Sequence, residues 1–386
     1  MTRQAWAAVG GPVGRRCTVW KQSLLVRCRP GAEAVVRENI VYVLGAGFSA
    51  PLGLPVMSNF LMRSKDLFAE DPERFAHFEG VFQEIHKMAQ AKNYLEIDLS
   101  NIEQILSILD MEEYAGGPAH RDAFIRFLAD TVSALTPSTH VPQFPEGLPG
   151  DWEGRLFSEK GEVRAYCTWL AGLFGVSIRA TSATGVLDFA EDPEAGADFS
   201  IISLNYDMVL ETCLDLINSQ VSPRGKLSFR GTVQGDGIPF AKLHGSVEGP
   251  TIVPPTWQKH AGEPVRDAWE LAVHLLNEAN EIRILGFSFP ETDGYMKYLL
   301  ALGAMRAPHL KSIDTICLDP TGEVERRYRD FISFGAFRFL SKDLVGYVGS
   351  YGGRTDERVV GEWHGHKRVR FQGLDTYHRR FVGRDT

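Results

Sequence analysis

The sequence predicts an α/β fold in which a doubly wound parallel sheet carries an inserted helical module. Three observations predict it: short buried runs that end in turn residues, helical patterns between those runs, and one unusually long interval. The runs are continuously apolar rather than alternating, as expected for parallel strands that helices cover on both faces. Five such runs occur: "IVYVLGAG" (40–47), "FSIISLN" (199–205), "PFAKLHG" (239–245), "IRILGFS" (282–288) and "DTICLDP" (314–320).

About 150 residues separate the first run from the second, far more than one crossover connection requires. Within this interval, Ser100 and Glu103 fit a capping box, in which each side chain accepts from the backbone amide of the other. The stretches "HRDAFIRFLADTVSAL" and "VRAYCTWLAGLFG" have the pattern of further amphipathic helices. We therefore expect a helical module at about 70–190. Its best-defined helix places four apolar residues on one face: Ile102, Ile105, Leu106 and Leu109.

Charge divides the chain into three parts. The net charge is −8, but residues 1–38 contribute +5 and residues 341–386 contribute +3, which leaves −16 for residues 39–340. An acidic central domain argues against a direct nucleic-acid surface there. We expect 1–38 to be a poorly ordered N-terminal extension and 341–386 to be a basic C-terminal tail that contacts an assembly or a partner.

The sequence contains nothing close to the ~18 uninterrupted apolar residues of a membrane helix. Its five cysteines form no CxxC pair, which excludes a zinc ribbon and gives no sign of a disulfide framework. A reducing cytoplasm is the expected location. The pair His364 and His366 in the tail lacks further ligands, so we expect no metal.

The first apolar run ends in a glycine-rich loop. Residues Gly45 to Ala50 match G-x-G-x-x-A directly after a strand, and Pro51 suits the first turn of a following helix. Glycines in such a Rossmann-like loop let the backbone approach a pyrophosphate, although a tight strand-to-helix turn would use the same residues. The next segment, "MSNFLMRSKDLFAED", has a helical pattern instead of a strand ending in an acid. A standard nicotinamide dehydrogenase is therefore not favoured.

Polar or small residues follow every predicted strand at its carboxyl end, where ligands bind in parallel sheets. A lone histidine at a strand end is more often structural, and an Asn-x-Asp pair is often only a helix cap. Their joint arrival at one edge nevertheless favours a binding site. The candidates are the loop Gly45, Ala46, Gly47, Phe48 and Ser49, then Asn205, Asp207, His244, Gly286, Ser288 and Asp319.

Taken in order, the motifs GAGFS, SLNYD, KLHGS and LGFSFPETD resemble the sirtuin family. They are most similar to a divergent bacterial branch of NAD hydrolases that act in anti-phage defence, in which a "GAGFS…GLP" opening, an "NIEQ"-type helix and an "LGFSFPETDGYMKYLL" stretch are characteristic. The resemblance covers residues 39–340, and the ordered set is specific although each motif alone is weak.

The resemblance implies roles for the candidate residues. Asn205 would orient the nicotinamide ribose and an attacking water, His244 would act as a base on the ribose hydroxyls, and Asp207 would shape the pocket. The loop Gly45, Ala46, Gly47, Phe48 and Ser49 would hold the pyrophosphate and part of the ribose of NAD. Gly286, Ser288 and Asp319 would correspond to the adenosine end.

Departures from the family pattern separate two activities. Protein-deacylating sirtuins carry a four-cysteine zinc module and a "GIPDFR" loop, whereas this chain has neither and continues with Gly53-Leu54-Pro55. Leu204 also replaces the glutamine that precedes the asparagine. We therefore expect NAD hydrolysis, with NAD as substrate and no metal. An NAD-dependent protein deacylase and a non-catalytic NAD or ADP-ribose binding module are the alternatives.

The same resemblance implies regulation, because uncontrolled loss of NAD would harm the host cell. Control in this branch comes from oligomerisation or a separate subunit. We expect a homo-oligomer, with a hexameric DNA-translocase-type ATPase or an Argonaute-like protein as candidate partners.

Overall fold

The computed structural model describes residues 37–90, 94, 97–137, 152–181, 186–191, 197–221, 226–248, 252–253, 263–290, 293–353, 359–363, 366–370 and 373–384. These residues belong to one compact unit. The predicted N-terminal extension, apart from Arg37 and Glu38, lies outside the described residues. Among the described helices, none is both long and apolar enough to cross a membrane.

The core of the unit is a seven-stranded sheet whose strand order is β5-β6-β4-β1-β7-β8-β9, with every neighbouring pair parallel. Apart from the added edge strand β5, this is the doubly wound order typical of dinucleotide-binding folds. The predicted fold class is confirmed. All five predicted strands are present but end two to four residues early. The strands are β1 (Glu38–Leu44), β4 (Ala197–Ser203), β5 (Phe229–Arg230), β6 (Ile238–Lys242), β7 (Glu281–Leu285), β8 (Ser312–Ile316) and β9 (Phe337–Leu340).

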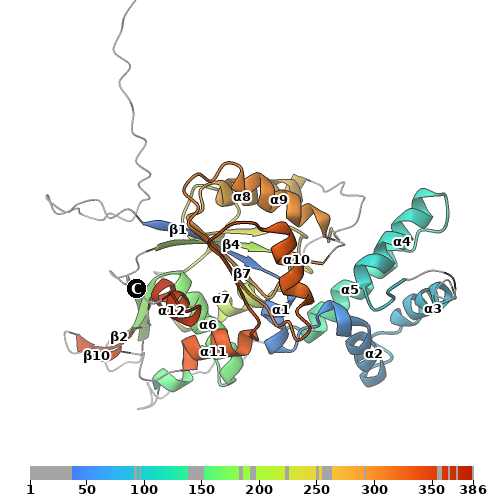
Figure 1. The fold of residues 1–386 in the computed structure, drawn as a ribbon. Coiled ribbons are helices and arrows are strands. Elements are labelled where there is room, and N and C mark those ends of the chain that lie inside the picture. Colours follow the sequence, from blue (N-terminus) through green and yellow to red (C-terminus); the bar gives the residue numbers. More distant parts are fainter. Residues whose placement is uncertain are drawn as a thin grey trace, which may run out of the picture. The chain divides into compact units, whose positions relative to one another are not determined.

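Helices cover both faces of this sheet, which is why its strands are apolar throughout (Figure 1). Along β1, Tyr42 packs on one face and Val41 and Val43 on the other, as the two-residue period of a strand requires. The second face is covered by α8 (Glu263–Asn277), α9 (Gly294–Ala304) and α10 (Glu323–Phe331). The first is covered by α6 (Gly161–Leu173), α7 (Val209–Gln220), α11 (Leu344–Gly353) and α12 (Leu374–Phe381).

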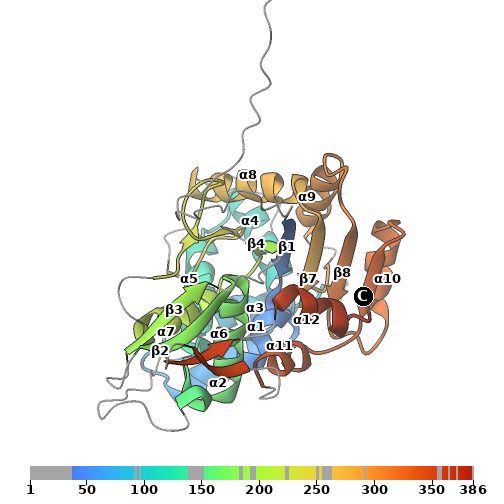
Figure 2. The same cartoon turned by 90° about the vertical axis from the view of Figure 1, so that its left-hand side faces the viewer.

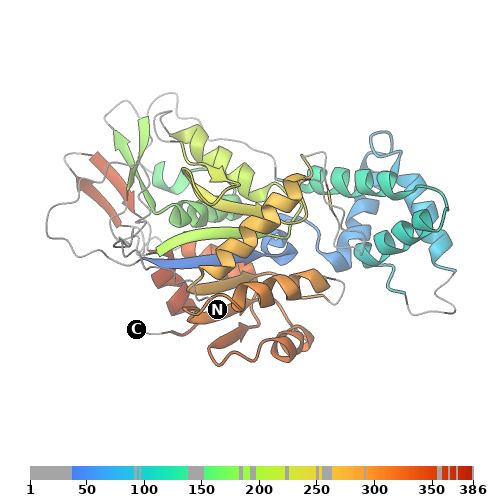
Figure 3. The same cartoon turned by 90° about the horizontal axis from the view of Figure 1, so that it is seen from above.

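The interval between β1 and β4 begins with helices that pack against one another (Figure 3). Phe127 on α5 meets Phe60 and Phe78 at ring-centre distances of 5.9 and 4.6 Å. The predicted apolar face of α4 is buried. After the short turns η1 (Ala50–Leu52) and η2 (Met57–Asn59), the helices are α2 (Phe60–Glu70), α3 (Phe78–Met88), α4 (Ile102–Tyr114) and α5 (Arg121–Leu135).

The predicted capping box of α4 is wrong by one residue. Asn101 is the N-cap, and its side chain accepts from the amides of Glu103 and Gln104 at 3.0 and 3.2 Å. Ser100 instead donates its hydroxyl to Asp98 at 2.6 Å. Asparagine and serine are equally good caps, so the sequence pattern alone could not separate them.

The last part of the interval 70–190 differs from the predicted helical module. After η4 (Trp152–Arg155), helix α6 packs on the main sheet, and the chain then forms strands. These strands belong to a four-stranded antiparallel sheet with the order β10-β11-β2-β3 (Figure 2). Its strands come from two distant parts of the sequence, which no local pattern could reveal: β2 (Val176–Thr181), β3 (Val186–Glu191), β10 (Val359–Trp363) and β11 (His366–Arg370).

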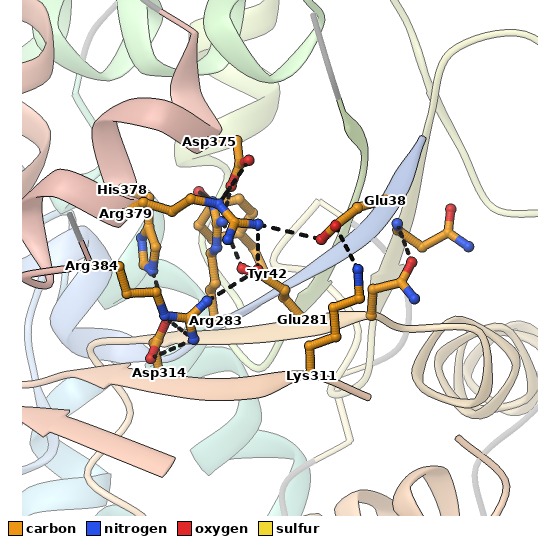
Figure 4. Close-up of polar contacts among 12 residues, drawn as sticks. Glu38, Tyr42, Glu281, Arg283, Lys311, Asp314, Asp375, His378, Arg379 and Arg384 are labelled. Carbon is orange, nitrogen blue, oxygen red and sulfur yellow. Dashed lines mark hydrogen bonds and ion pairs between the residues drawn. The ribbon is translucent and has the colours of Figure 1, made fainter. Parts of the chain in front are cut away.

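A buried network of charges joins the first residues of β7 and β8 to α12 (Figure 4). Arg283 on β7 is fully buried and donates to Glu281 at 2.8 Å and to Asp375. Arg379 and Arg384 also reach Glu281, at 2.5 and 3.1 Å. Buried charges are tolerated when each is paired and hydrogen-bonded, as these are.

His378 completes the network. It is fully buried, with Nδ1 2.9 Å from the Tyr347 hydroxyl and Nε2 3.2 Å from Asp314. Burial, reinforced by the charge of Arg283, lowers the pKa of His378 to about 3 although Asp314 opposes the shift. Arg379 and Arg384 contribute to the positive charge of the predicted C-terminal tail. In the structure they pair with Glu281 and Asp314, which belong to the chain's own sheet.

Removing the charge of Arg283 while keeping its volume should strongly destabilise the fold. Arg283→Met leaves Glu281 and Asp375 short of a cation, and breaking a buried pair costs about 3–5 kcal/mol. Arg266→Met, which removes an exposed pair with Glu270, should cost at most about 0.5 kcal/mol. Urea unfolding of both variants measures this difference, and equal losses would contradict it.

His378 should also make stability depend on pH. An unfolded histidine has a pKa of about 6.5, so the unfolded chain binds more protons than the folded one between that pH and about 3. Stability should fall as the pH falls through this window, approaching about 1.4 kcal/mol per pH unit from this group. His378→Gln should flatten the slope by that amount in urea titrations, whereas His309→Gln, at an exposed site, should not. A slope unchanged by His378→Gln would contradict the assignment.

Candidate functional site

The site lies at the carboxyl ends of the central strands, where the loop after β1 meets the loop after β7. The first loop runs from Gly45 through the single helical turn α1 (Ala46–Ser49). Its backbone is bonded to the second loop: the Gly45 amide donates to Leu285 at 3.0 Å, and the Gly47 amide donates to Gly286 at 2.8 Å. The two loops are therefore joined directly, main chain to main chain.

Glycines are required for this contact. A Cβ on Gly47 would lie 2.8 Å from the Gly286 carbonyl oxygen, and one on Gly286 would lie 2.2 Å from the Phe48 nitrogen. Gly286 also has φ +66, a conformation that favours glycine. The Cβ directions of Gly45 and Gly47 face the second loop. The proposed contact of this loop with a pyrophosphate stays a prediction.

Asn205 follows β4, the strand beside β1. Its side-chain amide donates to the Gly45 carbonyl at 3.0 Å and to the Ser49 hydroxyl at 3.2 Å, and it is 8% exposed. Two bonds to the glycine loop fix the orientation of this side chain. The structure thus brings together Asn205 and the loop, as the sequence predicts.

Asp207 lies two residues further along and accepts from the Val209 amide at 3.1 Å at the start of α7. Burial raises the pKa of its carboxyl group, although the Ser49 hydroxyl, the Val209 amide and the charge of Lys242 act in the opposite direction. Ser49 therefore interacts with both members of the Asn-x-Asp pair. Asp207 therefore caps α7 and also shares Ser49 with Asn205.

His244 follows β6, the next strand, and is 4% exposed. Its Nδ1 lies 3.0 Å from the Leu204 carbonyl oxygen. A carbonyl only accepts, so Nδ1 carries a proton, and Nε2 has a lone pair whenever the ring is uncharged. The Tyr206 ring lies beside the imidazole, with ring centres 5.8 Å apart.

Ser288 and Asp319, both predicted to bind the adenosine end, differ in their exposure to solvent. Ser288 is exposed. Asp319 is buried and accepts from the Gly322 and Glu325 amides at 3.0 and 2.8 Å, which caps α10. Burial alone would raise the pKa of Asp319, but these amides, with that of Val324, hold it below the usual value. Both carboxylate oxygens of Asp319 are engaged within the protein, so its adenosine role stays a prediction.

Phe48 anchors the glycine loop to the helix layer. Its ring packs against Tyr166 and Trp169 at 5.0 and 5.2 Å, and its carbonyl accepts from the Tyr166 hydroxyl. Phe48 is 1% exposed. Its side chain is therefore part of the core rather than of a ligand surface.

Two acidic residues of the site were missed from the sequence. Asp293 is 2% exposed, accepts from the Met296 amide at 3.4 Å, and has Oδ2 4.0 Å from His244 Nε2. Glu103 on α4 acts on Tyr206, whose pKa is raised first by burial and then by the charges of Glu103 and Asp293. Asp293 lies beyond the strand end; it is the last residue of the motif LGFSFPETD, and its position just before an apolar helix is typical of a helix cap.

The arrangement combines a fixed amide, a buried imidazole and nearby carboxyl groups. Such groups can position a water molecule and accept a proton from it or from a hydroxyl. Within the described part of the chain, no group of three or more His, Cys, Asp or Glu side chains is placed to hold a metal ion.

No protein-family model matches this chain, and no curated protein sequence does. Among solved structures, 18 chains match. One is titled "Sir2 bound to acetylated peptide", with 12% identity and a TM-score of 0.34 over 80% of this chain and 90% of that one. A Sir2 homolog–NAD complex aligns at 13% identity and 0.33 over 81% and 86% of the two chains. A mutant Sir2 homologue in complex with ADP ribose aligns at 11% and 0.35 over 90% and 94%. Because these identities and TM-scores are low, the site is interpreted from its own geometry.

The loop contact gives a testable cost. Gly286→Ala combines left-handed strain with a clash against the Phe48 nitrogen, whereas Gly322→Ala has similar strain at φ +79 with no atom within 4 Å. Both should lose about 1–2 kcal/mol from the backbone conformation. Gly286→Ala should lose about 1–3 kcal/mol more from overpacking. Urea unfolding measures both, and equal losses would show that the loops separate without cost.

Proposed function

We propose that this chain is an NAD hydrolase that releases nicotinamide and ADP-ribose. The observation that supports it most is the convergence of Asn205 and His244, from neighbouring strands, beside a glycine loop at the switch point of the sheet. A purely structural pair would not need a buried amide and a buried imidazole at the one edge where this fold class binds nucleotides.

In the proposed reaction the bond between C1′ of the ribose and the nicotinamide nitrogen breaks. Both electrons go to nicotinamide, which leaves as a neutral base, so no acid is needed to protonate it. Water then adds its oxygen to C1′, and one proton is released. Asn205 positions the water and the ribose, and His244 Nε2 accepts the proton before passing it to solvent.

The charges near the site suit this reaction. The transition state carries positive charge on the ribose, which fixed negative groups and oriented dipoles stabilise without having to reorganise. Asp293 lies close to His244, and Asp207 and Asn205 both interact with the Ser49 hydroxyl. No metal enters any of these steps.

A role in anti-phage defence by NAD depletion, in the cytoplasm, is part of the proposal and rests on the sequence resemblance alone. The same holds for assembly as a homo-oligomer and for control by a hexameric DNA-translocase-type ATPase or an Argonaute-like protein. The protein deacylase is disfavoured because the chain lacks the four-cysteine module of those enzymes.

The proposal predicts that purified protein, alone or with cell extract, releases nicotinamide from NAD. Asn205→Ala and His244→Ala should each lower kcat by about 10²–10⁴-fold. The first removes the group that positions the water, and the second removes the group that accepts the proton. Chromatographic detection of nicotinamide measures this loss. His309→Ala, which removes an exposed histidine, is the matched control and should keep full activity.

The two alternatives give distinct results. Tight NAD binding by calorimetry without any release, with or without extract, would replace the hydrolase by a binding module. Release that depends on an added acylated peptide would favour the deacylase.

A further inference from the structure

We infer that Asp293 is the positioning residue of His244, holding the imidazolium that forms when Nε2 accepts a proton. This inference deepens the proposed hydrolase and rests on it for its catalytic meaning. The contact itself is a property of the fold and can be tested without turnover.

The geometry orients the ring from both sides. Nδ1 faces the Leu204 carbonyl at 3.0 Å, so its proton is held there. Nε2 lies 4.0 Å from Asp293 Oδ2, which is too long for a hydrogen bond but close enough for an interaction between charges. When Nε2 gains a proton, the new N–H and its positive charge appear next to a carboxylate. Hydrogen bonds of catalytic groups are often long before substrate binds and shorten in the reacting complex.

Burial makes the charge of Asp293 effective. The side chains of His244 and Asp293 are 5% and 3% exposed, so little water screens the pair. Among the described residues, Tyr206 lies beside the ring, and its pKa is raised first by burial and then by the charges of Glu103 and Asp293. Trp269 on α8 is uncharged and donates to the carbonyl of Leu243, the residue before His244, at 3.0 Å.

The backbone that delivers Asp293 is constrained. Gly286 packs against Gly47, and three residues later Phe289 has φ +53 although it is not glycine. Phe289 is buried and stacks on Tyr328 at 4.7 Å. Strained residues that the surrounding packing enforces are frequent at active sites. The segment from Gly286 to Phe289 is therefore held in place by packing close to the site.

The simpler interpretation is that Asp293 only caps α9, since it accepts from the Met296 amide. Asparagine caps a helix as well as aspartate does and has nearly the same shape. Asp293→Asn therefore keeps the cap and removes the charge. Asp343→Asn is the matched control, because Asp343 is exposed and accepts from the Gly346 amide at 2.7 Å.

The experiment is a pH titration of the histidine ring signals by NMR in protein with ¹³C-labelled histidine, with the His244 signal assigned from His244→Gln. An opposite charge at this distance favours the charged form by about one pKa unit or more. Asp293→Asn should therefore lower the pKa of His244 by at least about one unit, and Asp343→Asn should leave it unchanged. An unchanged His244 pKa in Asp293→Asn would overturn the inference, whatever the activity.

A kinetic arm separates this inference from the proposed function. If wild type hydrolyses NAD, Asp293→Asn should lower kcat about 10-fold or more and move the acidic limb of the kcat/KM profile to lower pH. Loss of rate without movement of that limb would count against positioning. A lowered His244 pKa in a protein that never releases nicotinamide would keep the charge contact and reject the hydrolase.

Discussion

The close approach of two glycine-containing loops, Gly45–Gly47 after β1 and Gly286 after β7, is the constraint on which the site depends. Because no side chain separates the loops, their main chains bond directly beside the switch point of the sheet. Asn205 then takes its orientation from the Gly45 carbonyl on one side of this junction. Asp293, which precedes α9, lies 4.0 Å from His244.

The buried charge network and the candidate site lie at opposite ends of the same sheet. The buried charges of Glu281 and Arg283 lie at the start of β7, whereas the glycine loop and His244 lie beyond the carboxyl ends of their strands. The two groups of polar residues therefore do not compete for the same partners. A change that weakens the charge network should lower stability before it alters the geometry around His244.

Continuous apolar runs and their turn residues were sufficient to predict the five main strands, and the strand-end rule found Asn205 and His244 together. Packing between distant segments was not predictable. The second sheet pairs Ile178 with Val369, and Arg283 sits inside an apolar run as a buried cation that requires partners from α12. Asp293 was missed because it follows the strand by several residues and looks like an ordinary helix cap.

The bond between Asn205 and Gly45 spans 160 residues of sequence. Loop-closure entropy grows slowly, by about 0.6 kcal/mol for each doubling in length, so the intervening helices can vary in size at little thermodynamic cost. Folding rate responds differently, since contacts between distant residues form slowly. A chain whose helices have formed but whose β1 has not yet reached β4 lacks the carbonyl that orients Asn205. The orientation of Asn205 is therefore set only when the central sheet forms.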